Sequence, residues 1–216
     1  LNHKDSYDAF DKVEFELDLG YTEDATADGK KSFKIECKPD GDFTKLMDVK
    51  PVMCGTPADK KNAVKSVDED LTFSEKVTYN CDVGYTLDAS ADGTATYEES
   101  CASDGKFADS GNACKPVDCG AVTTPENSEL KDGDAKQVFP QSATYECKPG
   151  YSGDRLLSSS LTEVTVSCKA DGNFLVLGSC QNNDDCSSPE NGCNSNGACV
   201  DAELPTGKHD DDFSCK

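Results

Sequence analysis

Short runs in which apolar and polar residues alternate recur along this chain, and Asp-Gly or Pro-Gly dipeptides separate them. Clear runs are residues 76–80 (KVTYN), 142–146 (SATYE) and 162–168 (TEVTVSC). Alternation with a period of two predicts strands that bury one face, and the glycine dipeptides predict turns. No segment sustains the 3.6-residue period of an amphipathic helix. The pattern therefore predicts small all-β units.

The strand runs belong to an internal repeat of about 65 residues. Residues 15–21 (FELDLGY), 79–85 (YNCDVGY) and 145–151 (YECKPGY) are versions of one segment. Residues 20–37 (GYTEDATADGKKSFKIEC) also align with residues 84–101 (GYTLDASADGTATYEESC) over 18 positions without a gap. The chain therefore carries three copies of one unit.

Each of the later two copies contains four cysteines, with Gly-Tyr after the second and Gly-x-aromatic after the third. This combination resembles the sushi family, also called complement control protein or short consensus repeat, over about residues 1–180. The resemblance implies compact β modules with cysteines paired first to third and second to fourth. The implied pairs are Cys54–Cys101, Cys81–Cys114, Cys119–Cys168 and Cys147–Cys180.

The family usually has Trp after the third cysteine, and this chain departs from that pattern. Phe43, Phe107 and Phe174 stand there instead. Phe can fill the same core position with less area and without an indole donor. The departure weakens a transfer of the complement-regulating functions known for some members of the family.

Copy one lacks two of its four cysteines. Leu17 stands where the second should be and Val49 where the fourth should be. Both halves of one implied bridge are replaced together, which itself supports the second-to-fourth pairing. We expect a Leu–Val contact there, worth about 1.5–3 kcal/mol per buried side chain against about 2–4 kcal/mol for a bridge.

Cys37 is the third cysteine of copy one, and its implied partner is the first cysteine of that copy. By the spacing of the other copies, that partner lies about ten residues before Leu1. We therefore expect the chain to begin inside a module, as a mature or truncated sequence. The alternative is a disulfide from Cys37 to another chain.

The cysteine spacing changes abruptly after Cys180. The last four cysteines and the segment 186–201 (CSSPENGCNSNGACVD) resemble the opening of an EGF-like domain, which implies the pairs Cys186–Cys199 and Cys193–Cys215. We thus predict three sushi-like modules at residues 1–53, 54–118 and 119–180, and an incomplete EGF-like module at 181–216. Links of four or five residues between cysteines predict an elongated rod of modules.

The entry to the last module resembles that of calcium-binding EGF domains. Asn182, Asp184, Asp185 and Asp201 fall at the matching positions, although Asp185 replaces the usual Glu or Gln. Ca²⁺ prefers six to eight carboxylate and carbonyl oxygens, so these residues are candidate ligands. The alternative is a solvated acidic linker. The acidic run 209–212 (HDDD) is interpreted as a loop.

Composition narrows the class of protein further. Thirteen cysteines, no tryptophan and 35% hydrophobic residues in 216 favour several small disulfide-stabilised modules, and disulfides persist in oxidising compartments. We therefore predict a secreted or cell-surface protein. A reduced protein with metal-binding thiols is the alternative, but there is no CxxC pair and only His3 and His209.

Charge and motifs exclude several functions. A net charge of −21 repels nucleic acid and anionic membranes, and no apolar run approaches the roughly 18 residues of a membrane span. The segment 150–154 (GYSGD) lacks the final glycine of a serine elbow, and no acid–base pair is evident, so no enzyme is predicted.

We predict a non-catalytic extracellular protein that mediates protein–protein contacts. Repetition and acidity favour a structural building block whose partners are other proteins or copies of itself. The alternative is an adhesin or receptor ectodomain that recognises one ligand, including complement-type regulation.

Overall fold

The computed structural model describes residues 6–156, 159–187, 193, 197–201 and 213–216. These residues form short β-strands and one 3₁₀ turn, η1 (Asp185–Ser187), and contain no α-helix. The predicted all-β, disulfide-rich fold class is confirmed. No helix in this described part has the length and apolar character to cross a membrane. His3, the run 209–212 and most of the EGF-like segment 188–196 lie outside the described residues.

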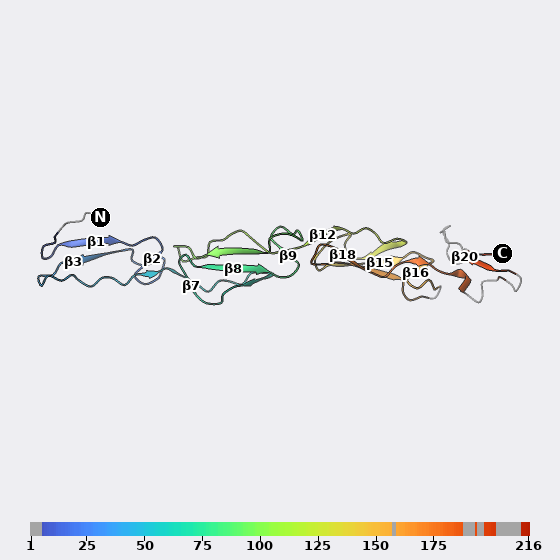
Figure 1. Cartoon of the computed structure of the whole chain (residues 1–216), viewed down its shortest axis with the longest axis horizontal. Coiled ribbons are helices and arrows are strands. Elements are labelled where there is room, and N and C mark those ends of the chain that lie inside the picture. Colours follow the sequence, from blue (N-terminus) through green and yellow to red (C-terminus); the bar gives the residue numbers. More distant parts are fainter. Residues whose placement is uncertain (1–5, 157–158, 188–192, 194–196, 202–212) are drawn as a thin grey trace. The chain divides into compact units, whose positions relative to one another are not determined.

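Figure 1 shows the strands of the chain in sequence colours, and the chain divides into two units. Unit 1 comprises Leu1–Asp82 and Ala95–Cys114, and unit 2 comprises Val83–Thr94 and Lys115–Lys216. The division crosses the predicted module 54–118, because its loop 83–94 belongs with unit 2. The module boundaries at 53, 118 and 180 therefore stay predictions.

Unit 1 contains two sheets built on the same scheme. β1 pairs antiparallel with β3, and β8 lies between β6 and β10. Two shorter pairs, β2 with β4 and β5 with β7, flank these sheets. The strands of unit 1 are β1 (Lys12–Glu16), β2 (Tyr21–Thr22), β3 (Ser32–Glu36), β4 (Lys50–Pro51), β5 (Met53–Gly55), β6 (Ala63–Lys65), β7 (Leu71–Thr72), β8 (Lys76–Cys81) and β10 (Thr96–Ser100).

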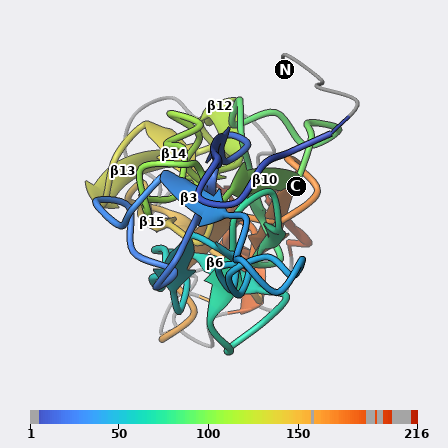
Figure 2. The same ribbon diagram turned by 90° about the vertical axis from the view of Figure 1, so that its left-hand side faces the viewer.

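Unit 2 is built around a four-stranded antiparallel sheet of order β13-β15-β17-β18. Figure 2 shows β13 and β15 side by side in this sheet. The strands of unit 2 are β9 (Tyr85–Thr86), β11 (Lys115–Pro116), β12 (Asp118–Ala121), β13 (Ser128–Asp132), β14 (Lys136–Val138), β15 (Ser142–Cys147), β16 (Tyr151–Ser152), β17 (Glu163–Cys168), β18 (Phe174–Leu177), β19 (Gln181–Asn182), β20 (Cys199–Asp201) and β21 (Phe213–Cys215).

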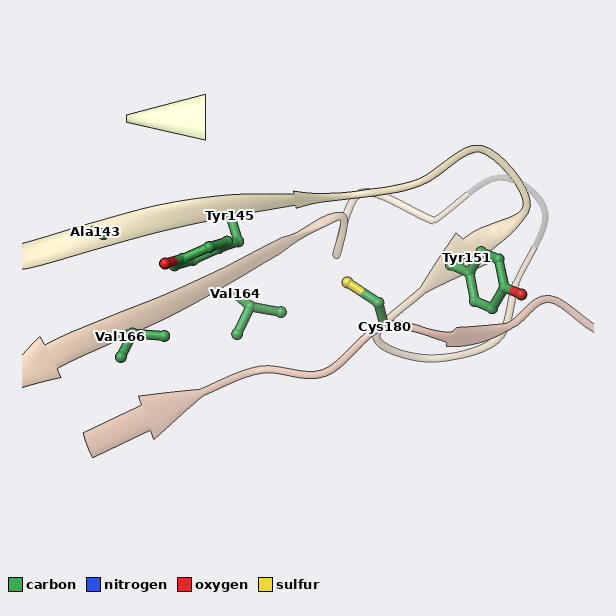
Figure 3. Close-up of a cluster of buried hydrophobic side chains, with 6 residues drawn as sticks. All are labelled: Ala143, Tyr145, Tyr151, Val164, Val166 and Cys180. Atoms are coloured by element: carbon green, nitrogen blue, oxygen red, sulfur yellow. The ribbon is translucent and has the colours of Figure 1, made fainter. Parts of the chain in front are cut away.

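The core of unit 2 follows from the alternation along β15 and β17. Tyr145 and Val164 are cross-strand partners and are both buried, as are Ala143 and Val166 one pair further along. Figure 3 shows these side chains pointing into one cluster beside Cys180. The intervening residues of both strands are partly or fully exposed. The period-two pattern thus places every second side chain in the core.

In unit 1, the cross-strand positions that correspond to Tyr145 and Val164 carry a pair of aromatic residues. Phe15 stacks on Phe33 and Tyr79 stacks on Tyr97, each with ring centroids 5.1 Å apart. In each pair the two residues face each other across an antiparallel ladder, which is β1–β3 for the first pair and β8–β10 for the second. Stacked cross-strand aromatic pairs stabilise a sheet beyond their buried area. The sequence repeat therefore produces the same core site in both sheets.

Three phenylalanines lie opposite the third cysteine of each copy. Phe43 bridges Cys37, Phe107 bridges Cys101, and Phe174 pairs with Cys168. Phe43 is 45% exposed, whereas the other two are half-buried. The expectation that Phe fills the core is therefore wrong for Phe43, whose ring meets that of Tyr7 edge-on with centroids 6.1 Å apart.

Candidate functional site

Six disulfides anchor the structure at the cysteine positions of the two complete copies and the C-terminal segment. They are Cys54–Cys101, Cys81–Cys114, Cys119–Cys168, Cys147–Cys180, Cys186–Cys199 and Cys193–Cys215. Small modules bury too little apolar surface to be stable alone, and bridges of this kind compensate by restricting the unfolded chain. The bridges therefore fix the backbone of the modules, on whose surface any partner would bind.

Copy one has a cleft at the place where the other copies carry their second disulfide. Leu17 and Val49 line one cleft of about 330 Å³ together with Phe15, Tyr21 and Phe33. Val49 remains 41% exposed. The two aliphatic residues thus line one cavity, but the exposure of Val49 means that their burial recovers only part of the area that we expected. This difference arises because an aliphatic pair has no bond that closes the gap.

Cys37 is free and buried. Its Sγ lies 4.0 Å from the carbonyl oxygen of Tyr7 and 3.8 Å from that of Lys38. The amide of Cys37 donates to Asp11 O, and the amide of Phe10 donates to Cys37 O. Residues 7–11 therefore run beside this cysteine. Both expectations for its partner, an upstream cysteine or another chain, stay predictions.

A partly buried ion pair lies against the aromatic stack of β8 and β10. Lys60 Nζ lies 3.0 Å from Glu99 Oε1, whose side chain is buried, and 5.5 Å from the centre of the Tyr79 ring. The hydrogen bond from Lys60 to Glu99 raises the pKa of the lysine, and burial raises the pKa of Tyr79 and Tyr97. The alternation along the chain offered no sign of this pair, because Glu99 is a charged residue at an inward position of a strand.

Inside unit 1, backbone hydrogen bonds join the Gly-Tyr segment of copy one to the linker residue Val52, and Val52 to Phe73 of copy two; we call this arrangement a link. The amide of Val52 donates to Gly20 O at 2.8 Å, and the amide of Phe73 donates to Val52 O at 2.7 Å. The Phe73 ring meets Tyr21 edge-on, with ring centroids 6.1 Å apart. Val52 is completely buried. The Gly-Tyr segment, the linker and the next strand are therefore one packed assembly.

The same link recurs inside unit 2. Val117 N donates to Gly84 O at 2.9 Å, and Phe139 N donates to Val117 O at 2.8 Å. Tyr85 and Phe139 meet edge-on with centroids 5.9 Å apart, and Val117 is buried. The repeat therefore encodes the link between successive elements as well as the elements themselves. Sequence comparison of the copies could have found it, since Gly-Tyr and the linker valine recur at one spacing.

Within each link, a polar side chain closes the loop after Gly-Tyr. Thr22 Oγ1 donates to Thr26 O at 3.0 Å, and Thr86 Oγ1 donates to Ser90 O at 2.9 Å. The backbone amide of Thr26 also donates to Asp24 and holds the pKa of that carboxyl below its ordinary value. These short loops are consequently fixed by local bonds.

The third link, also inside unit 2, is polar. The amide of Asn183 donates to Gly150 O at 2.9 Å, so Asn183 occupies the position of Val52 and Val117. Its Oδ1 accepts a hydrogen bond from Ser152 Oγ at 2.6 Å, and both residues are buried. Sequence reasoning missed Asn183, because one amide between two other polar residues carries no signal.

The calcium candidates surround this third link. Asp184 Oδ1 accepts from the amide of Cys186 at 3.1 Å, and Asp201 Oδ1 accepts from the amide of Asp185 at 3.4 Å. Arg155 lies 3.8 Å from the other carboxylate oxygen of Asp201. Asn182 pairs with Tyr151 in the β16–β19 ladder.

Asp184 and Asp201 thus each accept from a backbone amide, and Asp201 also faces a guanidinium, whereas Asp185 is buried. Within the described residues, no group of three or more His, Cys, Asp or Glu is arranged to hold a metal ion. Calcium binding by Asn182, Asp184, Asp185 and Asp201 stays a prediction.

Comparisons with known proteins agree with this architecture. Residues 54–114 match the family model of the sushi repeat (SCR repeat). The chain is 32% identical over 139 residues, 62% of its length, to the rat (Rattus norvegicus) "Sushi, von Willebrand factor type A, EGF and pentraxin domain-containing protein 1". It is 30% identical over 136 residues to the mouse (Mus musculus) protein of that name. The aligned part spans about 4% of the rat protein and 3% of the mouse protein.

Proposed function

We propose that this chain is a non-catalytic part of an extracellular multi-module protein and serves as a structural building block through protein–protein contacts. The observation that carries the proposal is the repeated link. Gly20, Val52 and Phe73 make the same backbone bonds as Gly84, Val117 and Phe139. A link that is rebuilt in successive copies suits a chain whose modules are held in fixed relation to their neighbours.

Two further findings support an extracellular role. Disulfide-rich modules are stable in oxidising compartments, and the chain has six bridges. The sushi repeat match and the relatives with sushi and EGF domains in their name point the same way. The name of these relatives also supports an EGF-like identity for residues 181–216.

A recognition function, as an adhesin or receptor ectodomain, is the second candidate. The observation that favours it is the cleft of copy one, which Leu17 and Val49 line together with aromatic residues and the acidic Glu16 and Asp18, and whose volume lies within the usual range of about 300–1,000 Å³ for ligand sites. Complement-type regulation falls within this class.

Cross-linking of the native protein in its own extracellular material tests the proposal. A lysine-reactive cross-linker followed by mass spectrometry reports which proteins lie against each unit. A building block gives cross-links from both units to copies of itself or to neighbouring structural proteins. A recognition protein gives cross-links concentrated on one partner at one site. Recovery of the protein without any intermolecular cross-link contradicts both functions.

A further inference from the structure

Strand β18 departs from the repeat. It continues the sheet of unit 2 beyond β17 with the sequence Phe-Leu-Val-Leu, whereas the corresponding segment of the preceding copy, residues 107–110 (FADS), forms no strand. Leu175, Val176 and Leu177 are 44%, 52% and 56% exposed. None of these three residues belongs to the core cluster of this unit, although Phe174 at the start of β18 packs against that cluster.

β18 is also an open edge. Within the described residues it pairs with β17 alone. An antiparallel strand directs alternate backbone amides and carbonyls to opposite sides, so half of those on β18 point away from β17. Natural sheets usually protect such an edge with charges, proline or a covering loop, because an unprotected edge pairs with another strand. β18 carries neither a charge nor a proline among its own residues.

The segment around β18 is uncharged, which is unusual in this acidic chain. Residues 172–183 include no charged residue, although 29% of the chain is charged. Beyond this segment, Lys169 pairs with Asp171 at 2.9 Å in the turn before β18, and Lys131 of β13 is shared by Glu146 and Glu163 at 3.2 and 2.7 Å. Two copies that each carry a net charge of −21 can therefore meet at this edge without a like charge inside the contacting strands.

The sequence of the edge complements itself. In an antiparallel pairing about a two-fold axis at Val176, each Leu175 faces a Leu177 and the two Val176 residues face each other. Each Phe174 then faces a Gly178, so a large ring meets a residue without a side chain. Gly178 cannot gain one, because an added Cβ would lie 2.7 Å from Glu163 O at a φ of +97°. Such an isologous interface closes as a dimer.

From these observations we infer that β18 pairs antiparallel with β18 of a second copy and joins the two sheets. This inference rests on the proposed function, for which it names one partner and one surface. Two four-residue strands bury less than the roughly 1,200–2,000 Å² of a stable interface. The contact is therefore weak in solution and becomes effective where copies are concentrated in an assembly.

Sedimentation of the full chain at protein concentrations of about 1–500 µM tests this pairing, because an interface of this size is expected to be weak. The wild type forms a non-covalent dimer, checked on a non-reducing gel. Its association strengthens when NaCl rises from about 0.15 M to 0.5 M, because the salt screens repulsion between the copies. Amide hydrogen exchange at residues 174–178 slows with concentration, since the outward amides of β18 become bonded.

Val176→Lys places a charge at the centre of the pairing and weakens association at least about tenfold. Val64→Lys is the matched control, because Val64 is a 63% exposed valine in another edge strand, β6, and its variant associates as the wild type does. Leu177→Glu is a second disrupting variant from the other face of β18. Circular dichroism and the disulfide map establish that each variant is folded.

Two outcomes overturn the inference. One is a wild type that stays monomeric throughout this range. The other is association that Val176→Lys and Val64→Lys weaken equally or not at all, which would place the contact elsewhere. Neither outcome bears on the cross-linking of the native protein, so the failure of this pairing is distinguishable from the failure of the proposed function.

Discussion

The ring of Phe73 covers Gly20 so closely that a Cβ built on this glycine would lie 2.2 Å from the ring atom Cδ1. Phe139 covers Gly84 in the same way, with a corresponding distance of 2.3 Å. Both glycines have a positive φ, +82° and +83°. The Gly-Tyr segment of the repeat is thus required by two physical conditions, a left-handed backbone and an aromatic ring in contact with Cα.

Replacing Gly20 by alanine is expected to destabilise unit 1 by about 2–4 kcal/mol, because the methyl group adds a clash with Phe73 to the cost of a positive φ. Gly41→Ala is the matched control: Gly41 has a φ of +87°, but nothing lies within 4 Å of its added Cβ. It should cost only about 1 kcal/mol. Urea unfolding of both variants measures the difference, and equal losses would show that the ring contact contributes nothing.

A disulfide restored in copy one should stabilise it. Leu17→Cys with Val49→Cys places cysteines at the second and fourth positions, which are bridged in the other copies, and both positions line one cleft. The new loop of about 30 residues predicts a gain of about 2–4 kcal/mol. Peptide mapping without reduction identifies the bond, and thermal unfolding measures its effect. Each single variant should give no gain, and a double variant whose two introduced cysteines stay unlinked would contradict our assignment of these positions.

Gln137 is a polar residue at a core position of unit 2. It is completely buried, and its Oε1 has no hydrogen-bond partner among the described residues, while its Nε2 donates to Asp134 O at 3.2 Å. Leu71 occupies the same position in the preceding copy and is buried. We expect Gln137→Leu to raise the free energy of unfolding by about 1 kcal/mol, because an unsatisfied buried acceptor is removed.

The reciprocal variant Leu71→Gln provides the comparison. It buries an amide without prepared partners in unit 1 and should cost about 1–3 kcal/mol. Denaturant unfolding of the two variants against wild type is sufficient. A loss of stability in Gln137→Leu would mean that the bond to Asp134 O outweighs the unpaired oxygen.

Alkaline pH should destabilise the sheet of β8 and β10. The folded pKa of Lys60 lies above its ordinary value of 10.5, and those of Tyr79 and Tyr97 lie above 10.0. A group whose pKa is higher in the folded state contributes its full stability below the unfolded pKa and loses it as the pH rises through the folded value. Stability should therefore be constant up to about pH 9.5 and fall above it.

Tyr97→Phe removes one of these ionisations and should make the fall with pH less steep. The measurement is the urea midpoint between about pH 8 and pH 11.5, which spans the ordinary pKa values of tyrosine and lysine. A slope that Tyr97→Phe leaves unchanged would show that this phenol does not contribute.

The sequence alone determined the fold class, because period-two alternation and glycine turns are local properties that survive in any all-β arrangement. It also located the two replaced positions in copy one, since Leu17 and Val49 stand at aligned cysteine positions. Internal repetition made both deductions possible, because each copy serves as a reference for the others.

Only the tertiary structure decided where buried polar groups and open surfaces lie. The pairing of Lys60 with Glu99, the burial of Gln137 and the cleft beside Val49 depend on which segments meet across tens of residues of chain. The open edge of β18 likewise depends on the order of strands in its sheet. A local pattern states which face of a strand is apolar, but packing between distant segments decides whether that face is covered.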